Sequence, residues 1–385
     1  MPPVTLNSVK YAERMGHPKE WTLDGLSLGP VNLVVGKNAT GKTRTLNIIW
    51  TLAKMLVAEP KFRPLNAGYD LLFDSDGQML RYILHIDNGK VTREEVYVGA
   101  EQLLVRGLGG EGQILTKEEG KRIRFKPPEN ELAVVARRDS LQHPFLEPLH
   151  DWAAGVRHYT FGTQLGKDHV SLSMKGAPEA DDRDPAQVVG IFRKGLRDFG
   201  PKFVQAVERD MIELHYELQG VETLAPESIV LLRGGVATEV LAIGVRERGV
   251  SGVVDQSEMS QGMFRALSIL IQVNYSQMAR RANCILIDDI GEGLDFDRSA
   301  LLIQLLRRKA QESAFQLIMS TNDQFVMNHV PLEEWSVLQR EGSHIRVRNH
   351  ENSKKAFEYF RFVGLSNFSF FEMDFVNSKE TAAHE

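Results

Sequence analysis

A glycine-rich segment ahead of a helical pattern is the first place where residue types and spacing imply chemistry. Residues 36–43 read Gly-Lys-Asn-Ala-Thr-Gly-Lys-Thr and fit the pattern G-x-x-x-x-G-K-[ST]. In such a loop, successive backbone N–H groups point at one anion, and the following helix adds its positive N-terminal end. We therefore expect Lys42 to reach the β and γ phosphates of a nucleotide and Thr43 to ligate Mg²⁺. The expected nucleotide contacts are Gly36, Lys37, Asn38, Ala39, Thr40, Gly41, Lys42, Thr43 and Arg44.

Two acidic residues close a later apolar run. Asp288 and Asp289 follow Cys284–Ile287 directly. A carboxylate at the end of a central strand can hold the Mg²⁺ shell, and we assign that role to Asp288. Asp289 is then the candidate general base for the attacking water. The alternative is a solvated acid pair at a strand end, which is common in α/β proteins.

A Ser-x-Gly turn is the third element. Ser260, Gln261 and Gly262 stand at the start of an apolar helical pattern, about two dozen residues before Asp288. Backbone N–H groups at such a helix start can bind an anion. Taken alone, the segment is equally an N-cap serine followed by a glycine.

The elements that must position these residues form an α/β pattern. The all-apolar run Val31–Val35 predicts a buried strand, and Thr45–Val57 predicts a helix behind it. Leu80–Arg138 predicts an antiparallel lobe with a hairpin turn at Asp87–Gly89. Residues 140–225 look mainly helical around a polar loop, Lys175–Pro185, and no heptad pattern predicts a coiled coil.

The second half alternates strands and helices, which predicts a mostly parallel core sheet flanked by helices. The expected elements are a strand pair at Ile229–Val245, a helix at Gln261–Met278, strands at Cys284–Ile287 and Phe315–Met319, a strand pair around Trp335–Val347, and a helix at Ser353–Phe362. We expect one domain over 1–385. It is made of a P-loop and β part (1–140), a helical insertion (141–228), and a last part that carries the Ser-x-Gly turn, the acidic pair and a short tail (229–385).

In this order, the motifs resemble those of the ABC-type ATPase heads of SMC-like and OLD-like bacterial proteins. Glu292–Asp295 is similar to the D-loop of such heads, and Ser320–Asp323 falls where their switch loop is expected. The resemblance implies a P-loop NTPase fold that binds ATP and Mg²⁺ and dimerises head to head. It also implies that Ser260, Gln261 and Gly262 contact the nucleotide of the opposite subunit.

The chain departs from the family pattern at two positions. Asp289 stands where most members carry Glu, and Asn322 stands where they carry a switch-loop His. Asn can bind a phosphate by a hydrogen bond but cannot carry a proton at neutral pH. Both departures therefore favour slow ATP hydrolysis.

Three further positions are open to two interpretations each. Gln164 is the candidate for the loop glutamine that senses Mg²⁺ and the attacking water, or else an ordinary surface residue. Tyr11 or Trp21 could stack on adenine, although core packing is the simpler use of an aromatic residue.

Composition describes an ordinary soluble protein. The 385 residues are 42% hydrophobic and 25% charged, with a formal net charge of −5, so bulk charge gives no attraction to nucleic acid or membrane. Cys284 is the single cysteine, the segment Met1–Lys10 lacks a signal-peptide core, and no apolar run is long enough to span a membrane. We therefore expect a cytoplasmic protein.

Two weaker patterns have structural interpretations. Lys121, Arg122, Arg124 and Lys126 could follow a phosphate backbone, but charges on an edge strand also guard against aggregation. His143 and His150 lie seven residues apart, and we expect no constellation of cysteine or carboxylate ligands around them, so a zinc site is not expected.

The sequence leaves three functional hypotheses open. The first is an ATP-dependent switch that forms a dimer or a higher oligomer. It would act on a partner effector protein, for instance in anti-phage defence. The second is a DNA-associated, SMC-like repair ATPase. The third is the nucleotide-binding subunit of an ABC transporter, against which the Gln261–Met263 signature and the long β lobe argue.

Overall fold

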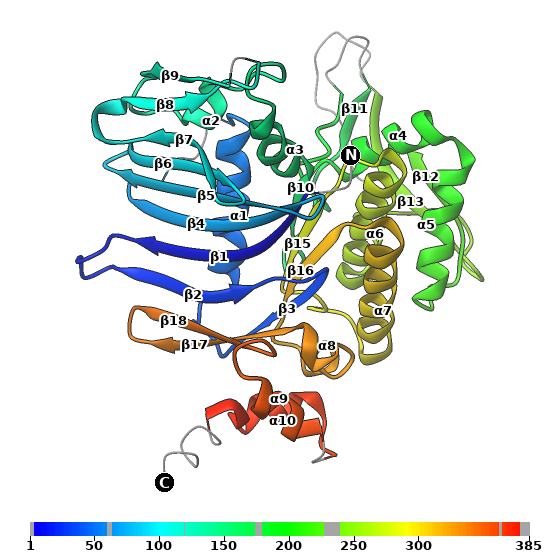
Figure 1. The fold of residues 1–385 in the computed structure, drawn as a ribbon. Helices are drawn as coiled ribbons and strands as arrows, with labels where there is room; N and C mark the ends of the chain where they lie inside the picture. The colour runs from blue at the N-terminus through cyan, green and yellow to red at the C-terminus, as the bar shows by residue number, and fades with distance from the viewer. Residues whose placement is uncertain are drawn as a thin grey trace. The chain divides into compact units, whose positions relative to one another are not determined.

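The structure, a computed structural model, describes residues 4–59, 64–118, 120–173, 179–226, 239–361 and 364–377 (Figure 1). The chain divides into two compact units. The first contains Met1–Val156, Asn283–Leu286 and Ala310–Glu385, and the second contains Arg157–Ala282 and Ile287–Lys309.

A mixed sheet forms the frame of the first unit. Its strands follow one another in the order β16 (Gln316–Ser320), β3 (Val31–Val35), β17 (Trp335–Glu341), β18 (His344–Asn349), β2 (Trp21–Ser27), β1 (Thr5–Glu13), β4 (Ala67–Ser75), β5 (Gln78–Asp87), β6 (Lys90–Val98), β7 (Glu101–Arg106), β8 (Gly112–Leu115) and β9 (Arg122–Phe125). Strand β3 is parallel to both β16 and β17, and β18 is parallel to β2.

Antiparallel pairing continues this sheet from β2 through β1 and β4 to β9. The antiparallel lobe is therefore an extension of the core sheet and not a separate one. Among these strands of the first unit, parallel pairing is limited to β16, β3 and β17 and to the pair β18 and β2. The strands from β4 onward are antiparallel, which the short connections between them allow. The predicted hairpin turn joins β5 to β6, with Asn88 and Gly89 at positive φ.

The helices of the first unit are α1 (Lys42–Leu56), α2 (Ala133–Ala136), α3 (Glu147–Gly155), α8 (Gln324–Asn328), α9 (Lys354–Arg361) and α10 (Asn367–Glu372). Three-residue 3-10 turns lie at η1 (Leu108–Gly110), η2 (Pro144–Leu146) and η3 (Leu332–Glu334). Leu46, Ile49 and Leu52 of α1 are fully or almost fully buried in the core cluster, together with Val34 of β3. The helix that follows the glycine-rich loop is therefore anchored by its apolar face.

A buried carboxylate organises the antiparallel lobe. Glu94 on β6 accepts hydrogen bonds from the backbone N–H groups of Ala133 (2.7 Å) and Val134 (3.0 Å) at the start of α2. The guanidinium of Arg106 lies 3.4 Å away and is also buried. Burial raises the pKa of Glu94, while the backbone donors act in the opposite direction.

The second unit is built around the long helix α6 (Gln261–Ala279). Helices α4 (Val188–Phe199) and α5 (Pro201–Glu213) pack on α6. A small antiparallel sheet has the order β11 (Ser171–Ser173), β13 (Glu239–Glu247) and β12 (Leu218–Leu224), with β14 (Val254–Asp255) also paired to β13. Strands β10 (Val156–Thr160) and β15 (Cys284–Asp288) and helix α7 (Phe296–Ser313) have residues in both units.

The region 140–225 contains the predicted helices, α3, α4 and α5, but also three strands that were not predicted, β10, β11 and β12. These strands are short, and two of them pair with β13, which is distant in sequence and provides no local signal. The first part of the predicted strand pair at Ile229–Val245 and part of the loop Lys175–Pro185 lie outside the described residues.

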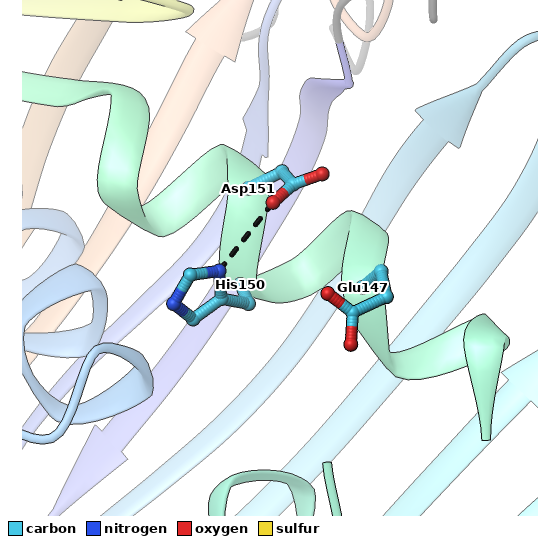
Figure 2. A group of neighbouring side chains, drawn as sticks. All are labelled: Glu147, His150 and Asp151. Carbon is cyan, nitrogen blue, oxygen red and sulfur yellow. Dashed lines mark hydrogen bonds and ion pairs between the residues drawn. The ribbon is translucent and has the colours of Figure 1, made fainter. Parts of the chain in front are cut away.

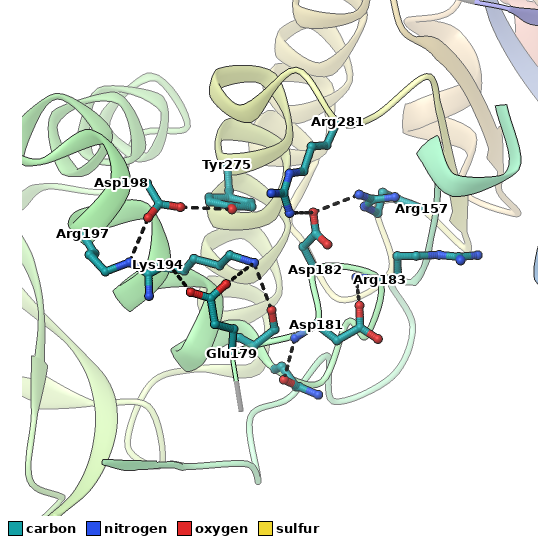
Figure 3. A network of polar contacts seen from close by, with 12 residues as sticks. Arg157, Glu179, Asp181, Asp182, Arg183, Lys194, Arg197, Asp198, Tyr275 and Arg281 are labelled. Carbon is teal, nitrogen blue, oxygen red and sulfur yellow. Dashed lines mark hydrogen bonds and ion pairs between the residues drawn. The ribbon is translucent and has the colours of Figure 1, made fainter. Parts of the chain in front are cut away.

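Ion pairs tie the polar segment before α4 to the rest of the second unit (Figure 3). Asp182 accepts from Arg157 of β10 at 2.9 Å and lies 3.8 Å from Arg281, which follows α6. On α4, Lys194 lies 3.5 Å from Glu179. Among the described residues, no helix combines the length and apolarity that a membrane crossing requires.

Candidate functional site

The loop between β3 and α1 forms a backbone cradle in the first unit. Ala39 and Gly41 have positive φ values, 63° and 102°, which turn the chain back before the helix begins. The hydroxyl of Thr40 donates to the carbonyl of Lys37 at 2.8 Å and closes the loop. A Cβ at Gly36 would lie 2.4 Å from Thr40 Oγ1, so this tight turn requires a glycine there.

The start of α1 has the properties of an anion site. No side chain caps the helix, because its N-cap residue is Gly41. The first backbone N–H groups therefore depend on another acceptor. Lys42 is 7% exposed, and its ammonium donates to the carbonyl of Gly36 at 2.8 Å, so a positive charge lies inside the cradle. Thr43 is exposed at the same helix start.

Arg44 is held beside the cradle by two partners. Its guanidinium lies over the ring of Trp21, 4.4 Å from the ring centroid, and forms an ion pair with Glu13. Tyr11 donates to Glu13 at 2.8 Å. Tyr11 and Trp21 are themselves 5% and 3% exposed, as core packing requires.

The loop after β16 leaves the sheet next to the cradle. Strands β16 and β3 are parallel with Ser320 opposite Val34, so Asn322 and Gly36 leave the sheet at the same level. Asp323 caps α8, since its Oδ1 accepts from the backbone N–H of Phe325 at 2.6 Å. Asn322 is exposed. The sheet thus places an amide side chain at the edge where the cradle begins.

The acidic pair lies in the second unit. Asp288 is 1% exposed at the end of β15, and its carbonyl accepts from the backbone N–H of Phe161 at 2.8 Å. Asp289 is half-buried with a φ of 54°, so the chain turns sharply directly after the strand. The two residues therefore have different surroundings, since Asp288 is buried and Asp289 is half-buried.

The Ser-x-Gly turn begins α6 in the same unit. Ser260 is exposed and is the N-cap, with its Oγ accepting from the backbone N–H of Met263 at 3.2 Å. A Cβ at Gly262 would lie 2.6 Å from the carbonyl oxygen of Gly293, so this glycine allows α6 to approach the loop after Asp289. In this turn, Ser260 therefore caps α6, and Gly262 lets the helix lie close to the backbone of Gly293.

Gln164 lies on an exposed loop after β10, close to the start of α6. Together with Gln261 and Lys167, it lines a cavity of about 350 Å³. Gln261 also donates to the carbonyl of Thr163 at 3.3 Å, and Lys167 donates to the carbonyl of Met259 at 2.6 Å. The second unit thus brings the loop of Gln164 against the start of α6.

Comparisons with known proteins place this geometry on a known fold. The sequence matches no protein-family model and no curated protein. A solved Smc head bound to the C-terminal winged-helix domain of ScpA matches with a TM-score of 0.51 at 14% identity, covering 92% of this chain and 100% of that one. The chain has the fold of an SMC head domain. SMC heads from Thermotoga maritima (TM-score 0.44, 14% identity, 91% of this chain and 99% of that one) and Pyrococcus furiosus (0.46, 11%, 93% and 100%) also match.

Within this SMC-head fold, the predicted site residues fall into two groups. The first unit contains the cradle Gly36–Thr43, Arg44 and Asn322. The second contains Gln164, Ser260–Gly262 and the pair Asp288–Asp289. The roles assigned to these residues remain predictions.

Sequence reasoning missed Arg265. This residue lies in the buried part of α6, is 9% exposed, and donates to backbone carbonyls of two loops. A signal was present, because Arg265 is a charged residue within the otherwise apolar run of the helix, where a charge must find partners.

A histidine-containing cluster on α3 lies elsewhere in the SMC-head fold (Figure 2). Contrary to the sequence-based expectation, carboxylates do lie near His150: one ligand atom each from Glu147, His150 and Asp151 lies within 4.8 Å of the others. Helical spacing brings them together. However, Arg138 donates to both carboxylate oxygens of Glu147, at 2.8–3.0 Å. This carboxylate already has a partner, and the cluster carries no metal assignment.

Proposed function

We propose that this protein is an ATPase that binds Mg-ATP at Gly36–Thr43 and closes head to head with a second copy. The observation that carries the proposal is the cradle itself: a helix start without a side-chain cap, a left-handed Gly41 and a buried ammonium at Lys42. Together these groups offer amide donors and a positive charge to one polyphosphate. The SMC-head fold supports this assignment.

The proposed chemistry divides among named residues. Lys42 neutralises charge on the β and γ phosphates, and the hydroxyl of Thr43 and the carboxylate of Asp288 hold Mg²⁺. Asp289 accepts the proton of the attacking water, and Asn322 and Gln164 position that water against the terminal phosphate. When bound, Mg²⁺ supplies charge neutralisation at the transferring phosphoryl group.

The second copy supplies the other face of the site. Ser260, Gln261 and Gly262 of one subunit contact the terminal phosphate held by its partner through the start of α6. Two identical surfaces then meet around a two-fold axis. Loss of the terminal phosphate removes contacts that exist only in the closed state, so hydrolysis opens the dimer.

Residue types at two positions favour slow turnover. The side chain of Asp289 is one methylene shorter than the Glu expected there, and Asn322 cannot shuttle a proton. Slow turnover suits a switch that stays closed while ATP is bound and acts on a partner effector, and we propose a cytoplasmic protein of this kind. A solved head of the same fold is bound to a domain of another protein, ScpA, which is consistent with a partner chain.

Light scattering after size-exclusion chromatography tests the proposal. An Asp289→Ala variant with Mg-ATP is expected to form a dimer that is absent or weaker without nucleotide. Lys42→Ala is expected to weaken ATP binding roughly ten- to hundredfold, because a hydrogen bond to a charged group contributes about 1.5–3 kcal/mol. Ser260→Arg is expected to retain ATP binding but lose the dimer.

Two results would contradict this function. One is a mass that does not change with ATP in the Asp289→Ala variant. The other is ATP binding that is equal in the wild type and in Lys42→Ala.

A DNA-associated ATPase is the second candidate, and the SMC-head fold is the observation that favours it. The basic segment Arg122–Phe125 forms strand β9 at the end of the sheet, where charge also prevents edge pairing. DNA retention that falls steeply with salt, and that requires ATP, would support this candidate. Retention that does not depend on ATP or salt would exclude it.

A further inference from the structure

Arg265 is a buried, positively charged residue on α6, the helix that begins with the Ser-x-Gly turn. It stands five residues after Ser260 and is 9% exposed among neighbours such as Phe264 and Ala266, which are fully buried. Burying a guanidinium is unfavourable unless its N–H groups find acceptors. The acceptors of its hydrogen bonds therefore show which parts of the chain this side chain connects to α6.

Three backbone carbonyls from two separate loops surround the guanidinium. Nε donates to the carbonyl of Thr163 at 2.9 Å, and Nη2 donates to that of Gly162 at 2.7 Å. Nη1 donates to the carbonyl of Glu292 at 2.8 Å. The planar fork of arginine fixes the directions of these bonds, and the single ammonium of lysine cannot reproduce them.

Glycines allow the two loops to approach this fork. Gly293 has a φ of +81°, and a Cβ there would lie 2.7 Å from Nη1 of Arg265. A Cβ at Gly162 would lie 2.3 Å from the carboxylate of Glu292. A side chain at residue 293 would therefore displace the buried guanidinium of Arg265, whereas one at residue 162 would displace the end of the Glu292 side chain.

In the proposed dimer, the two loops that meet at Arg265 and the helix that carries it face different nucleotides. Gln164 and Asp289 act on the nucleotide of their own subunit, whereas Ser260, at the start of α6, contacts the nucleotide of the other subunit. All of them belong to the second unit of the same chain. A side chain that ties α6 to both loops therefore links two nucleotide sites.

We propose that Arg265 is a positioning residue that couples the two ATP sites of the dimer. Contact between Ser260 and the terminal phosphate bound to the partner subunit fixes the position of the start of α6. Because the guanidinium of Arg265 bonds to both loops, a shift of α6 also moves the loops of Gln164 and Asp289. The inference rests on the proposed function and adds to it a route by which one site regulates the other. Coupling of this kind appears as cooperativity between sites.

ATP hydrolysis by Arg265→Lys, measured over a range of ATP concentrations, tests the coupling. The expected result is a kcat lower by roughly ten- to hundredfold, because small displacements of catalytic groups have effects of this size. The Hill coefficient is expected to fall from its wild-type value to about 1, since uncoupled sites act independently. ATP affinity, measured with a fluorescent ATP analogue, is expected to stay within error of the wild type, whereas the melting temperature is expected to fall because lysine leaves backbone carbonyls without a donor.

Arg281→Lys is the matched control. Arg281 follows the other end of α6, and its side chain is 53% exposed beside Asp182. The same chemical change there is expected to leave kcat and the Hill coefficient unchanged. If Arg265→Lys does not fold, Arg265→Gln keeps an N–H donor without a buried charge and is measured in the same way.

The outcomes separate the two proposals. Hydrolysis with the wild-type kcat and Hill coefficient in Arg265→Lys, or in Arg265→Gln if the lysine variant does not fold, overturns the coupling role and leaves the ATPase intact. A wild-type Hill coefficient of about 1 also overturns the coupling, because independent sites show no cooperativity. Wild-type protein without ATP-dependent dimerisation or hydrolysis, and unaffected by Lys42→Ala, overturns the ATPase assignment and the coupling with it.

Discussion

The carboxylate of Glu292 occupies the space in which a side chain at Gly162 would lie. A Cβ at residue 162 would be 2.3 Å from Oε2 of Glu292 and 3.6 Å from the Cβ of Asp289. The end of the Glu292 side chain therefore takes the space that the glycine at residue 162 leaves open between the loop after β10 and the turn that follows Asp289. This contact joins two segments that the proposed chemistry uses together.

Gly162→Ala tests the importance of that contact. The exposed Glu292 side chain can turn away from the new methyl group, so we expect the free energy of unfolding to change by less than about 1 kcal/mol. We expect kcat to fall roughly two- to tenfold, because the displaced carboxylate and the new methyl group change the packing between the loop of Gln164 and Asp289. Urea unfolding and steady-state ATP hydrolysis measure the two effects.

Gly107→Ala is the control for this prediction, since a Cβ at residue 107 meets no heavy atom within 4 Å. Adding Glu292→Ala to Gly162→Ala removes the clashing carboxylate and is expected to restore part of kcat. Equal activity of Gly162→Ala and the wild type would show that the contact has no role in catalysis.

Gly41→Ala tests the backbone of the cradle. Gly41 has a φ of +102°, and a Cβ there would lie 3.0 Å from the ring of Trp21. We expect a loss of stability of about 1–3 kcal/mol, together with weaker ATP binding. Gly77→Ala also forces a positive φ, +75°, but meets no heavy atom within 4 Å, so it isolates the conformational penalty. Equal losses in both variants would show that crowding against Trp21 is unimportant.

The parts of the fold that sequence predicted correctly are local ones. The strand Val31–Val35 and the helix after the glycine-rich loop are encoded by consecutive residues, and the hairpin at Asn88–Gly89 is encoded by turn residues that adopt positive φ. In each of these cases, the residues that determine the structure are neighbours in the chain.

Long-range contacts account for what the sequence did not predict. Arg265 bonds to carbonyls of residues 102 and 103 positions earlier, and no local pattern specifies an acceptor on a distant backbone. Strand β11 was assigned to a helical region although it pairs with β13, which lies far along the chain, with Ser171 opposite Leu241. The contact between Gly162 and Glu292 depends on loop geometry in the same way.

Lys309 and Asp210 form a buried ion pair whose removal should destabilise the second unit. Lys309 Nζ lies 2.7 Å from Asp210 Oδ2, and the two side chains are 8% and 4% exposed. Asn274 of α6 donates to Asp210 at 2.6 Å and accepts from Lys309 at 3.0 Å. We expect Lys309→Met to lower the free energy of unfolding by about 3–5 kcal/mol, because an uncompensated carboxylate remains buried.

Chemical denaturation of the double variant provides the comparison for this pair. Lys309→Met with Asp210→Leu removes both charges and is expected to recover most of the lost stability, since apolar pairs often replace buried ion pairs without loss. A double variant that is no more stable than Lys309→Met would show that the destabilisation does not arise from an unpaired charge.

Asp295 provides a prediction that depends on pH. Its Oδ1 accepts from the backbone N–H of Arg298 at 2.9 Å, at the start of α7, and its Oδ2 accepts from the Arg298 guanidinium at 2.6 Å. The backbone donor first, and the guanidinium after it, lower the pKa of Asp295 below its ordinary value. A lowered pKa in the folded state means that this stabilisation is complete above the unfolded pKa and is lost as pH falls through the folded one.

Asp295→Ala is therefore expected to lower the free energy of unfolding by about 1 kcal/mol near pH 7, the usual effect of losing a helix cap. The difference from the wild type should shrink below about pH 4, where the unfolded aspartate binds a proton and the folded one soon follows. Asp295→Asn keeps a capping oxygen without the charge, so its difference from Asp295→Ala should not vary over this pH range. Urea unfolding at several pH values measures both differences. A gap between the wild type and Asp295→Ala that is constant down to about pH 3 would mean that the ionised carboxylate contributes nothing beyond the neutral cap.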